Sequence, residues 1–368
     1  MALIDDEDHR ALAASVRRLV ADRSPLSRVR EVIAGGRSHD PAVWRGLVEL
    51  GLAGLTVPEA YGGAGGRQSD LAACLRVLGA GLVPSPLLAS TVLAANTLLF
   101  LEDEAARKRW LPQIAEGRAI AALATSEPTA KAWIAPPATT ASVRGDGHVL
   151  NGTKRAVLNG ADAAVVLVHA ADADGEGIYL VEAGAAGLRI TAEDNIDLTR
   201  ASATLTFTDT PAVRVEGDAR AALDRVADLA NLALSAEQSG AIRQALDVTV
   251  AYAKTRYSFG QPIGSYQGVK HKLADIYSDW SLVDAAVRRA VEAIDAGDPD
   301  GPAAATSARV LSAPAHLNAG KQMIILHGGI GFTWDHDAHL YYRNAIGDAC
   351  LLGDQTYQRA RLARQLGI

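Results

Sequence analysis

The chain reads RYSFGQPIGSYQ from Arg256 to Gln267, and a long helical pattern follows this segment at once. From Val269 to Ile294 apolar side chains recur at steps of four and three, the spacing of one continuous seam along a helix. The seam consists of Val269, Leu273, Ile276, Trp280, Val283, Val287, Ala290 and Ile294. Such a seam predicts close antiparallel packing against neighbouring helices.

Helical patterns also flank this segment on both sides. The stretch from about Leu223 to Tyr257 carries Gly240 and many alanines, which let neighbouring backbones come close. A further helix is predicted from about Ala303 to Leu326. We therefore expect residues 216–368 to form a four-helix bundle.

The first part of the chain, residues 1–118, is also predicted to be helical. Two apolar stripes at helical spacing consist of Leu12, Val16, Leu19 and Val20, and of Val43, Leu47, Leu50 and Leu52. The glycines of VPEAYGGAGG, from Val57 to Gly66, predict a loop, and a helix is expected over Asp70–Gly81. The next helix, Pro86–Leu101, is apolar nearly all round, which indicates that it is buried.

The period of the pattern changes between residues 119 and 215. The segments Ala164–Val168, Gly177–Val181 and Ala203–Thr210 are rich in β-branched residues, which favours strands. An Asp146-Gly147 turn between alternating segments predicts a β-hairpin. The order of the patterns predicts an α+β protein with three domains: a helical domain over 1–118, a β domain over 119–215 and a helical bundle over 216–368.

Composition narrows the classes of function. The chain has 368 residues, 49% of them hydrophobic, and a net charge of −6 with a pI of about 5.9, so no basic field favours a nucleic acid or an anionic membrane. No apolar run is long enough to span a bilayer, and the acidic start MALIDDEDHR does not resemble a secretory signal. The two cysteines, Cys74 and Cys350, form no spaced framework. We expect a cytoplasmic protein with reduced thiols.

Several segments resemble the acyl-CoA dehydrogenase family, flavoenzymes that desaturate acyl thioesters between the α and β carbons. They are Val57–Gly66, Leu111–Pro128, Gly152–Asn159, Arg256–Ile276 and the segment HGGIGFTWDHDAHLYYR from His327 to Arg343, and their order and spacing match the family. The resemblance implies the family's fold, with an N-terminal helical domain, a middle β domain and a C-terminal four-helix bundle. It also implies FAD as the cofactor and an acyl-CoA thioester as the substrate.

The resemblance assigns part of the cofactor site to the quoted segment. In the family, the residues that match Arg256, Ser258, Phe259 and Gln267 lie at a subunit interface and hold the dinucleotide half of the FAD bound to the neighbouring subunit. The chemistry fits, because an arginine fork pairs with a diphosphate and Gln can hydrogen-bond an adenine edge. Gly328-Gly329 would let the backbone approach the pyrophosphate. The alternatives are an arginine aligned with a helix dipole and an ordinary turn between helices.

On the flavin-ring side the sequence departs from the family pattern. Ser126-Glu127-Pro128 is kept in part, but TAKAWIAPP replaces the Gly-Ser-Asp segment that usually follows. Ala156 stands near the place of the aromatic residue that stacks on the ring, and Trp133 could replace it, although a core position suits Trp133 better. Ile325 stands where the family commonly has Gln. These changes remove a stacking surface and polar contacts to the cofactor.

The catalytic base is also missing from its usual places. The family's base is a carboxylate, and counting from the paired glycines through Arg343 puts it at Leu352. Some relatives carry the base on the first bundle helix, at a position that falls close to Ala230. Asp354 and Glu237 are the candidates for a relocated base. For Glu237 the alternative is a structural carboxylate near Arg243.

Three histidines, His327, His336 and His339, match no metal-ligand spacing, so no metal is expected and histidines at an interface near the dinucleotide are preferred. The pattern of loss and retention resembles the base-less subunits of the α2β2 acyl-CoA dehydrogenases of actinobacteria, several of which act on CoA thioesters of steroid side chains. It implies a subunit that supplies the dinucleotide clamp while a homologous partner supplies the catalytic Glu and the flavin-ring pocket. The alternatives are an active homo-oligomer with a relocated base and a scaffold without enzymatic function.

Overall fold

The N-terminal region of the protein consists of helices joined by short loops. The computed structural model describes residues 7–128, 132–145 and 147–368. The helices are α1 (Glu7–Arg23), α2 (Leu26–Ala34), α3 (Pro41–Glu49), α4 (Gln68–Ala80), η3 (Leu88–Ala95), α5 (Asn96–Phe100) and α6 (Glu104–Ala115), with short 3₁₀ turns η1 (Leu52–Gly54) and η2 (Glu59–Tyr61). Both predicted apolar stripes face the main core, since Val16, Val43, Leu47 and Leu52 are fully buried.

The predicted helix Pro86–Leu101 is buried, as expected, but half of it is not an α-helix. Its residues Leu88–Ala95, η3, form a π-helix, which continues into α5. The side-chain amide of Asn96 donates to the carbonyls of Thr91 (3.2 Å) and Val92 (2.8 Å). A side chain that occupies the carbonyls of the preceding turn is a common cause of such local irregularity.

The middle region is a small closed sheet. Its strands are β1 (Ala121–Ala124), β2 (Thr140–Arg144), β3 (Gly147–Leu158), β4 (Val165–Asp172), β5 (Gly175–Glu182), β6 (Leu188–Ala192) and β7 (Ser202–Val215). The order β4-β2-β3-β7-β5 closes because β5 also pairs with β4, while β1 joins β4 and β6 joins β7 at the margins. A second hydrophobic core fills this sheet, with Leu150, Val168, Tyr179 and Leu205 inside.

The predicted hairpin is present, but Gly147, expected in its turn, is the first residue of β3 and pairs with Arg144. Asp146 itself lies outside the described residues.

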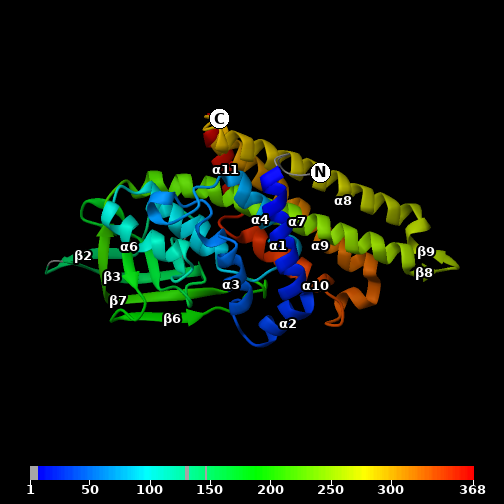
Figure 1. Cartoon of the computed structure of the whole chain (residues 1–368), viewed down its shortest axis with the longest axis horizontal. Helices are drawn as coiled ribbons and strands as arrows, with labels where there is room; N and C mark the ends of the chain where they lie inside the picture. Colours follow the sequence, from blue (N-terminus) through cyan, green and yellow to red (C-terminus); the bar gives the residue numbers. More distant parts are fainter. Residues whose placement is uncertain (1–6, 129–131, 146) are drawn as a thin grey trace.

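The C-terminal region is a bundle of long helices. It consists of α7 (Ala219–Thr255), α8 (Gln267–Asp295), α9 (Gly301–His327), α10 (Ala338–Cys350) and α11 (Gln355–Gln365), with the hairpin strands β8 (Tyr257–Ser258) and β9 (Gln261–Pro262) and the 3₁₀ turns η4 (Ile263–Ser265) and η5 (Gly328–Phe332). The sheet lies at one end of the molecule, and the β8–β9 hairpin projects at the other (Figure 1). The predicted seam of α8 faces the core, with Ile276, Val283 and Val287 almost fully buried.

Helix α7 is the centre of the molecule, and its middle turns from Val226 to Ile242 are buried on all sides. Glycines allow α4 and α7 to touch along their backbones. A Cβ on Gly240 would lie 1.9 Å from the carbonyl oxygen of Arg76, and one on Gly79 would lie 2.1 Å from that of Glu237. The prediction that Gly240 permits a close approach of backbones is therefore confirmed.

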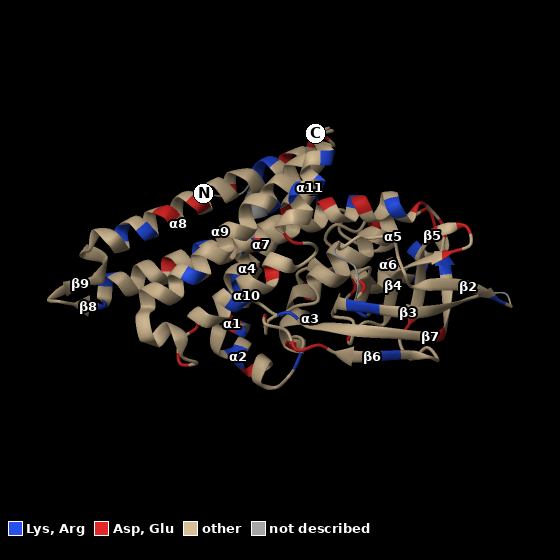
Figure 2. Ribbon diagram, turned by 180° about the vertical axis from the view of Figure 1, so that it is seen from behind, with Lys and Arg blue, Asp and Glu red and all other residues tan. Residues whose placement is uncertain are grey.

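Acidic and basic residues both occur along α7 and α8 (Figure 2), so neither helix presents charge of one sign alone. Among the helices described, none combines the length and the apolar character that crossing a bilayer requires.

Candidate functional site

The position of the family's base lies in the turn between α10 and α11. Leu352 is 7% exposed, and its side chain belongs to the main hydrophobic core. Its φ of +57° is the left-handed region, which costs a non-glycine residue about 1 kcal/mol. The Leu352 carbonyl accepts a hydrogen bond of 3.0 Å from the side chain of Gln358. A buried hydrocarbon is therefore held in a defined geometry at the place where proton abstraction needs a carboxylate.

The second base position, Ala230, lies on the fully buried part of α7. A methyl group cannot take up a proton. Neither position can supply the base for removal of an α-proton.

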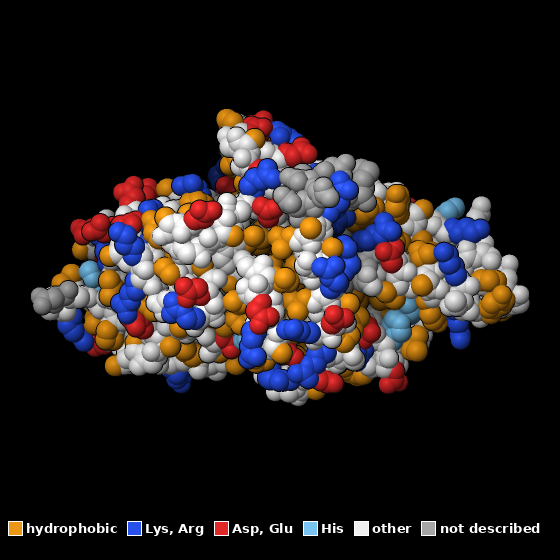
Figure 3. All heavy atoms as spheres, in the orientation of Figure 1, with side chains coloured by type: hydrophobic (Ala, Val, Ile, Leu, Met, Phe, Trp, Pro, Cys, Tyr) orange, Lys and Arg blue, Asp and Glu red, His pale blue; other side chains and the backbone are white. Residues whose placement is uncertain are grey.

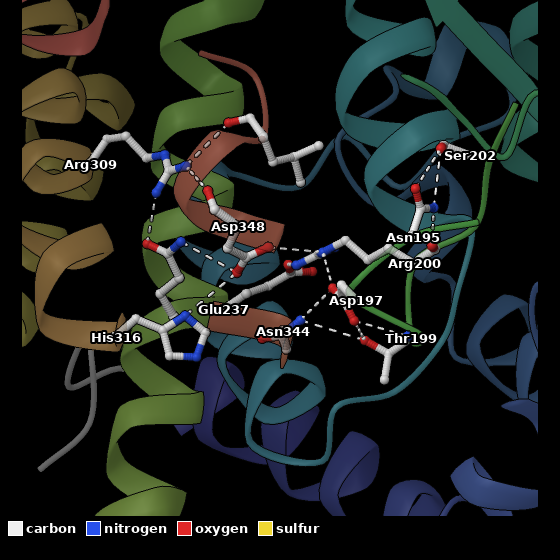
Figure 4. A network of polar contacts seen from close by, with 12 residues as sticks. Asn195, Asp197, Thr199, Arg200, Ser202, Glu237, Arg309, His316, Asn344 and Asp348 are labelled. Carbon is white, nitrogen blue, oxygen red and sulfur yellow. Dashed lines mark hydrogen bonds and ion pairs between the residues drawn. The ribbon is translucent and has the colours of Figure 1, made fainter. Parts of the chain in front are cut away.

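Near these two positions the structure has a buried ionic cluster (Figure 4). Arg200, two residues before β7, donates to the Oε2 of Glu237 on α7 at 2.5 Å and to the Oδ1 of Asp348 on α10 at 3.0 Å. The Oδ2 of Asp197 lies 3.5 Å from the Nε of Arg200. One guanidinium thus joins the β region to two helices of the bundle.

A second buried arginine completes the cluster from α9. Arg309 donates to the backbone carbonyl of Asp348, to that of Leu351 (3.2 Å) and to the side chain of Gln238 (3.1 Å). His316 lies with its Nδ1 3.6 Å from the Oδ2 of Asp348. We call Asp197, Arg200, Glu237, Arg309, His316 and Asp348 the Arg200 cluster.

The Arg200 cluster contains three carboxylates but only two arginines. Burial raises the pKa of Glu237 and of Asp197, and the repulsion of neighbouring carboxylates adds to this although Arg200 opposes it. Asp348 behaves differently: burial works against its ionised form, but Arg200, His316 and Arg309 hold its pKa below the usual value. Burial lowers the pKa of His316 to about 4, so its imidazole is neutral at pH 7.

Glu237, one of the two candidates for a relocated base, is therefore paired with Arg200. Arg243, which the sequence placed near it, pairs instead with Asp247 on the same helix (2.8 Å) and lies over the ring of Trp280 on α8. Glu237 lines a cavity together with Ser38, Leu82, Asn159 and residues of β7's leading turn, but the volume of this cavity is only about 30 Å³. That is room for about one water molecule and none for an acyl chain.

Asp354, the other candidate, has a structural contact. It is the N-cap of α11, and its side chain accepts a hydrogen bond of 2.8 Å from the backbone N–H of Tyr357. The residue is exposed.

On the flavin-ring side, the charged groups of Lys154 and Glu127 pair with each other inside the chain, while residues 129–131 of the TAKAWIAPP segment lie outside the described residues. The ammonium of Lys154, which is fully buried, lies 2.6 Å from Glu127. Burial works against the ionised form of Glu127, but Lys154 and the backbone N–H groups of Thr139 and Ala138 lower its pKa to about 2. Ala156 is an exposed methyl at a bulge of β3, with φ +51°. Trp133 is 7% exposed and packs in the main core, so it offers no open stacking surface.

On the side predicted to hold the dinucleotide, the polar and aromatic side chains face outward. Arg256 ends α7, Ser258 belongs to β8, and Gln267 begins α8; all three are exposed. Phe259, at the tip of the β8–β9 hairpin, is 97% exposed and has φ +49°. Exposure of a whole phenyl ring is unfavourable in water, which points to an external surface that covers it.

Gly328 and Gly329 lie in the turn after α9 and are open to the outside. A Cβ on either residue would meet no described heavy atom within 4 Å, so packing inside the chain does not require glycine here. At Gly328 the backbone conformation itself favours glycine, because its φ is +63°, whereas at Gly329 no contact within the described chain requires it. Ile325, one turn earlier, is 44% exposed and offers an apolar side chain where the family has an amide.

The histidines of this segment stack rather than converge. The ring centroids of His327 and His336 are 4.3 Å apart, and those of His327 and Tyr252 are also 4.3 Å apart. Tyr252 donates a hydrogen bond of 3.3 Å to the carbonyl of His327, which ties the end of α7 to the turn after α9. Within the described ranges, no three His, Cys, Asp or Glu side chains are grouped so that they could hold a metal ion.

Comparisons with known proteins agree with this geometry. Residues 6–118 match the acyl-CoA dehydrogenase N-terminal domain, and residues 214–367 match the C-terminal domain of the same family. Acyl-CoA dehydrogenase IpdE2 of Mycobacterium tuberculosis is 35% identical over 94% of this chain and 93% of its own length. The chain belongs to the acyl-CoA dehydrogenase family. Both the resemblance seen in the sequence and the three-part fold are thereby confirmed.

Solved structures of this family include assemblies of two different proteins. A variant of the Tcur3481–Tcur3483 steroid ACAD is 32% identical, with a TM-score of 0.89 and 98% of each chain covered. The ChsE4–ChsE5 complex from Mycobacterium tuberculosis is 29% identical, with a TM-score of 0.91 over 100% of this chain and 99% of that one. A glutaryl-CoA dehydrogenase from Mycobacterium smegmatis in complex with FADH2 shares the fold at 23% identity and a TM-score of 0.89.

Sequence reasoning missed most of the Arg200 cluster. Arg200 lies in an irregular segment without period, and Asp197 and Asp348 were not connected to it. One signal was available: Arg309 is a lone charged residue in the alanine-rich first half of α9, and a charge on an otherwise apolar helix face predicts a buried partner.

Proposed function

We propose that this chain is the non-catalytic subunit of a heterotetrameric, FAD-dependent acyl-CoA dehydrogenase in the cytoplasm. In this proposal a homologous partner subunit supplies the catalytic Glu and the flavin-ring pocket. This chain supplies Arg256, Ser258, Phe259, Gln267 and Gly328-Gly329 to the dinucleotide half of the same FAD. The substrate is an acyl-CoA thioester, and a steroid side-chain thioester is the preferred class because of the relatives.

The observation that carries the proposal is the buried leucine at the base position. Leu352 and Ala230 leave both usual positions of the base without a carboxylate, and the cavity beside Glu237 is about 30 Å³. The exposed phenyl ring of Phe259 and the open glycines suit a surface that another subunit covers. When bound, FAD accepts the hydride from the β carbon, and residues of this chain would only bind and orient its diphosphate and adenine.

The residues present fit one half of FAD better than the other. The exposed guanidinium of Arg256 and the open backbone at Gly328 suit a diphosphate. Ala156 offers a methyl group in place of a stacking ring, and Lys154 and Glu127 are paired with each other, which leaves fewer partners for an isoalloxazine ring among the described residues. A division of one FAD between two unlike subunits accounts for both observations.

The test compares this chain alone with a co-purified complex. The chain and the product of the adjacent reading frame are expressed separately and together, and FAD released by denaturation is measured per chain. We expect little or no FAD with this chain alone and one FAD for each pair of unlike subunits. If this chain alone bound one FAD per subunit and reduced a dye with an acyl-CoA, the proposal would be wrong.

An active homo-oligomer with Glu237 as the base is the second candidate. It is favoured by the raised pKa of Glu237 and by its position on the cavity. The ion pair with Arg200 works against it, because a base must be free to take up a proton from substrate. Glu237→Gln would then abolish turnover in protein that retains FAD, whereas the main proposal requires turnover to depend on the partner's carboxylate. A pure scaffold, the third possibility, predicts that Arg256→Ala leaves the FAD content of any complex unchanged.

A further inference from the structure

A large cavity lies between α1, α4 and α7, away from the base position. Its volume is about 830 Å³, which is in the range of pockets that bind small molecules. Its lining comes from α1 and the turn after it, from one face of α4, from α7 around Gly240 and from Tyr341 of α10. We call it the α1–α4–α7 cavity.

The α1–α4–α7 cavity is separate from the cavity beside Glu237. The two have no lining residue in common. Helix α4 divides them, since Ala73 and Val77 face one cavity whereas Leu78 and Gly79 face the other. A ligand in the α1–α4–α7 cavity would therefore touch none of the residues that line the cavity beside Glu237.

The walls of the cavity are apolar and mostly made of small side chains, which leaves width for a bulky ligand. Its floor is closed, because the backbones of α4 and α7 touch where Gly240 faces Arg76. The hydroxyl of Tyr341, at the floor, already donates to the carbonyl of Ala80 at 2.8 Å. The interior thus favours an apolar body that makes no hydrogen bonds of its own.

The charged residues that line the cavity are all positive. Four arginines, Arg10, Arg17, Arg76 and Arg243, line it, and no Asp or Glu is among its described lining residues. Arg76 pairs with Asp284 at 2.6 Å and Arg243 pairs with Asp247 at 2.8 Å, both outside the lining. Arg17 is exposed and has no hydrogen-bond or ion-pair partner among the described residues. Figure 3 looks onto the face that carries α1, where basic side chains lie beside apolar ones.

We infer that the α1–α4–α7 cavity binds an amphipathic carboxylate: a large apolar body, such as a fatty or steroid acid, that ends in one carboxylate. The apolar body would fill the space between the helices, and the carboxylate would lie at the mouth against Arg17. Arg17, which has no ion-pair partner among the described residues, would attract an anion, and the apolar walls would select its body. This inference does not rest on the proposed function, because it uses no residue of the dinucleotide clamp or of the Arg200 cluster.

The test uses the full chain, alone and in its complex, with the fluorescent polyene fatty acid cis-parinaric acid as the probe. We expect saturable binding of one probe per chain. Arg17→Glu should weaken it about tenfold, since one charge-assisted contact becomes repulsive. The matched control is Arg18→Glu, on the same helix but outside the lining, which should leave the affinity within about twofold.

Two further variants test the location of the probe. Ala73→Phe on α4 and Ala14→Phe on α1 each fill the cavity from one wall and should abolish binding, and thermal unfolding shows which variants are folded. Trp280 lies beneath Arg76 and Arg243, with their guanidinium carbons 5.7 and 4.8 Å from its ring. Energy transfer to the bound polyene should therefore fall in Trp280→Phe by more than in Trp334→Phe, which removes a tryptophan outside the lining.

Four outcomes would overturn the inference. The first is that a long-chain alkylamine binds as tightly as the carboxylate probe, and the second is that folded Ala73→Phe or Ala14→Phe binds the probe as the parent chain does. The third is that only the acyl-CoA thioester binds and the free acid does not. The fourth is that a chain that begins at Glu7 binds the probe about tenfold more tightly. The last would mean that residues 1–6 occupy the cavity and that no small carboxylate is its natural ligand.

Discussion

The dinucleotide end of the molecule and the Arg200 cluster are built in opposite ways. At the dinucleotide end, the guanidinium of Arg256, the ring of Phe259 and the backbone of Gly328 are exposed. Around Arg200, by contrast, a largely buried guanidinium is paired with buried carboxylates. The side chains of the first region face outward, whereas the charges of the second are paired within the chain.

This difference separates two tasks of the family. A subunit that holds its own substrate needs an open acyl cavity with a base that is free to react. Here the base position is a core leucine, and the nearest ionisable groups stabilise the junction of the sheet with the bundle. A subunit that completes a neighbour's cofactor site needs only an outward clamp, and we propose that Arg256, Phe259 and Gln267 belong to it. Substitutions around Arg200 should therefore change the stability of the fold and leave FAD binding to the dinucleotide end unchanged. Substitutions at the dinucleotide end should change FAD binding and leave the stability unchanged.

The largest loss of stability is expected from removing Arg200, the cation at the centre of the cluster. Arg200→Ala leaves Glu237 and Asp348 buried without their shared partner, and loss of one partner of a buried ion pair costs about 3–5 kcal/mol. Urea unfolding at pH 7 measures this loss. Arg189→Ala, an exposed arginine on β6, is the control and should change stability by less than about 0.5 kcal/mol.

The double variant Arg200→Ala/Glu237→Gln sharpens this result. Its loss of unfolding free energy should be smaller than the sum of the losses in the two single variants, since the charge of Glu237 is no longer buried without a partner. If Arg200→Ala cost no more than the control, the cluster would not be what holds the sheet against the bundle.

The next effect concerns cofactor and not folding. Arg256→Ala should weaken binding of FAD to the complex by roughly 10- to 100-fold, because one charge-assisted contact to the diphosphate is worth about 1.5–3 kcal/mol. The unfolding free energy should stay the same, since Arg256 is exposed. Lys254→Ala, two residues earlier and also exposed, is the matched control. Equal FAD retention in the two variants would remove the clamp from the proposal.

The two regions also differ in what could be read from the sequence. The clamp is contiguous, so Arg256, Phe259 and Gln267 were identified as one motif, and the seam of α8 followed from its period. The Arg200 cluster is assembled from four separate elements, and no local sequence pattern around a residue such as Asp348 predicts which distant residue it contacts. The π-helical turns of η3 were missed for a similar reason, because they depend on where the amide of Asn96 bonds.

A smaller effect is expected in acid. The pKa of Glu127 is lowered to about 2 from an ordinary value of 4.5, so its pairing with Lys154 stabilises the fold fully above pH 4.5. That contribution is lost as the pH falls from about 4.5 to about 2, because the unfolded chain takes up the proton first. In Glu127→Gln, the decrease of the unfolding free energy between about pH 4.5 and about pH 2 should be smaller by roughly 1–2 kcal/mol. Glu116→Gln, an exposed carboxylate, should leave the limb as it is.

The smallest effect distinguishes a cap from a base at Asp354. Asp354→Ala removes the acceptor for the N–H of Tyr357 and should cost about 1 kcal/mol, whereas Asp354→Asn keeps a capping oxygen and should cost a few tenths. In the complex, both variants should retain turnover, since we assign proton abstraction to the partner subunit. A base would behave in the reverse way: Asp354→Asn would remain as stable as the parent protein and retain FAD but would lose turnover, because an amide caps a helix as an acid does and cannot remove a proton. The Asn variant thus separates two roles that the Ala variant alone would confuse, and a loss of turnover in it would return the active site to this chain.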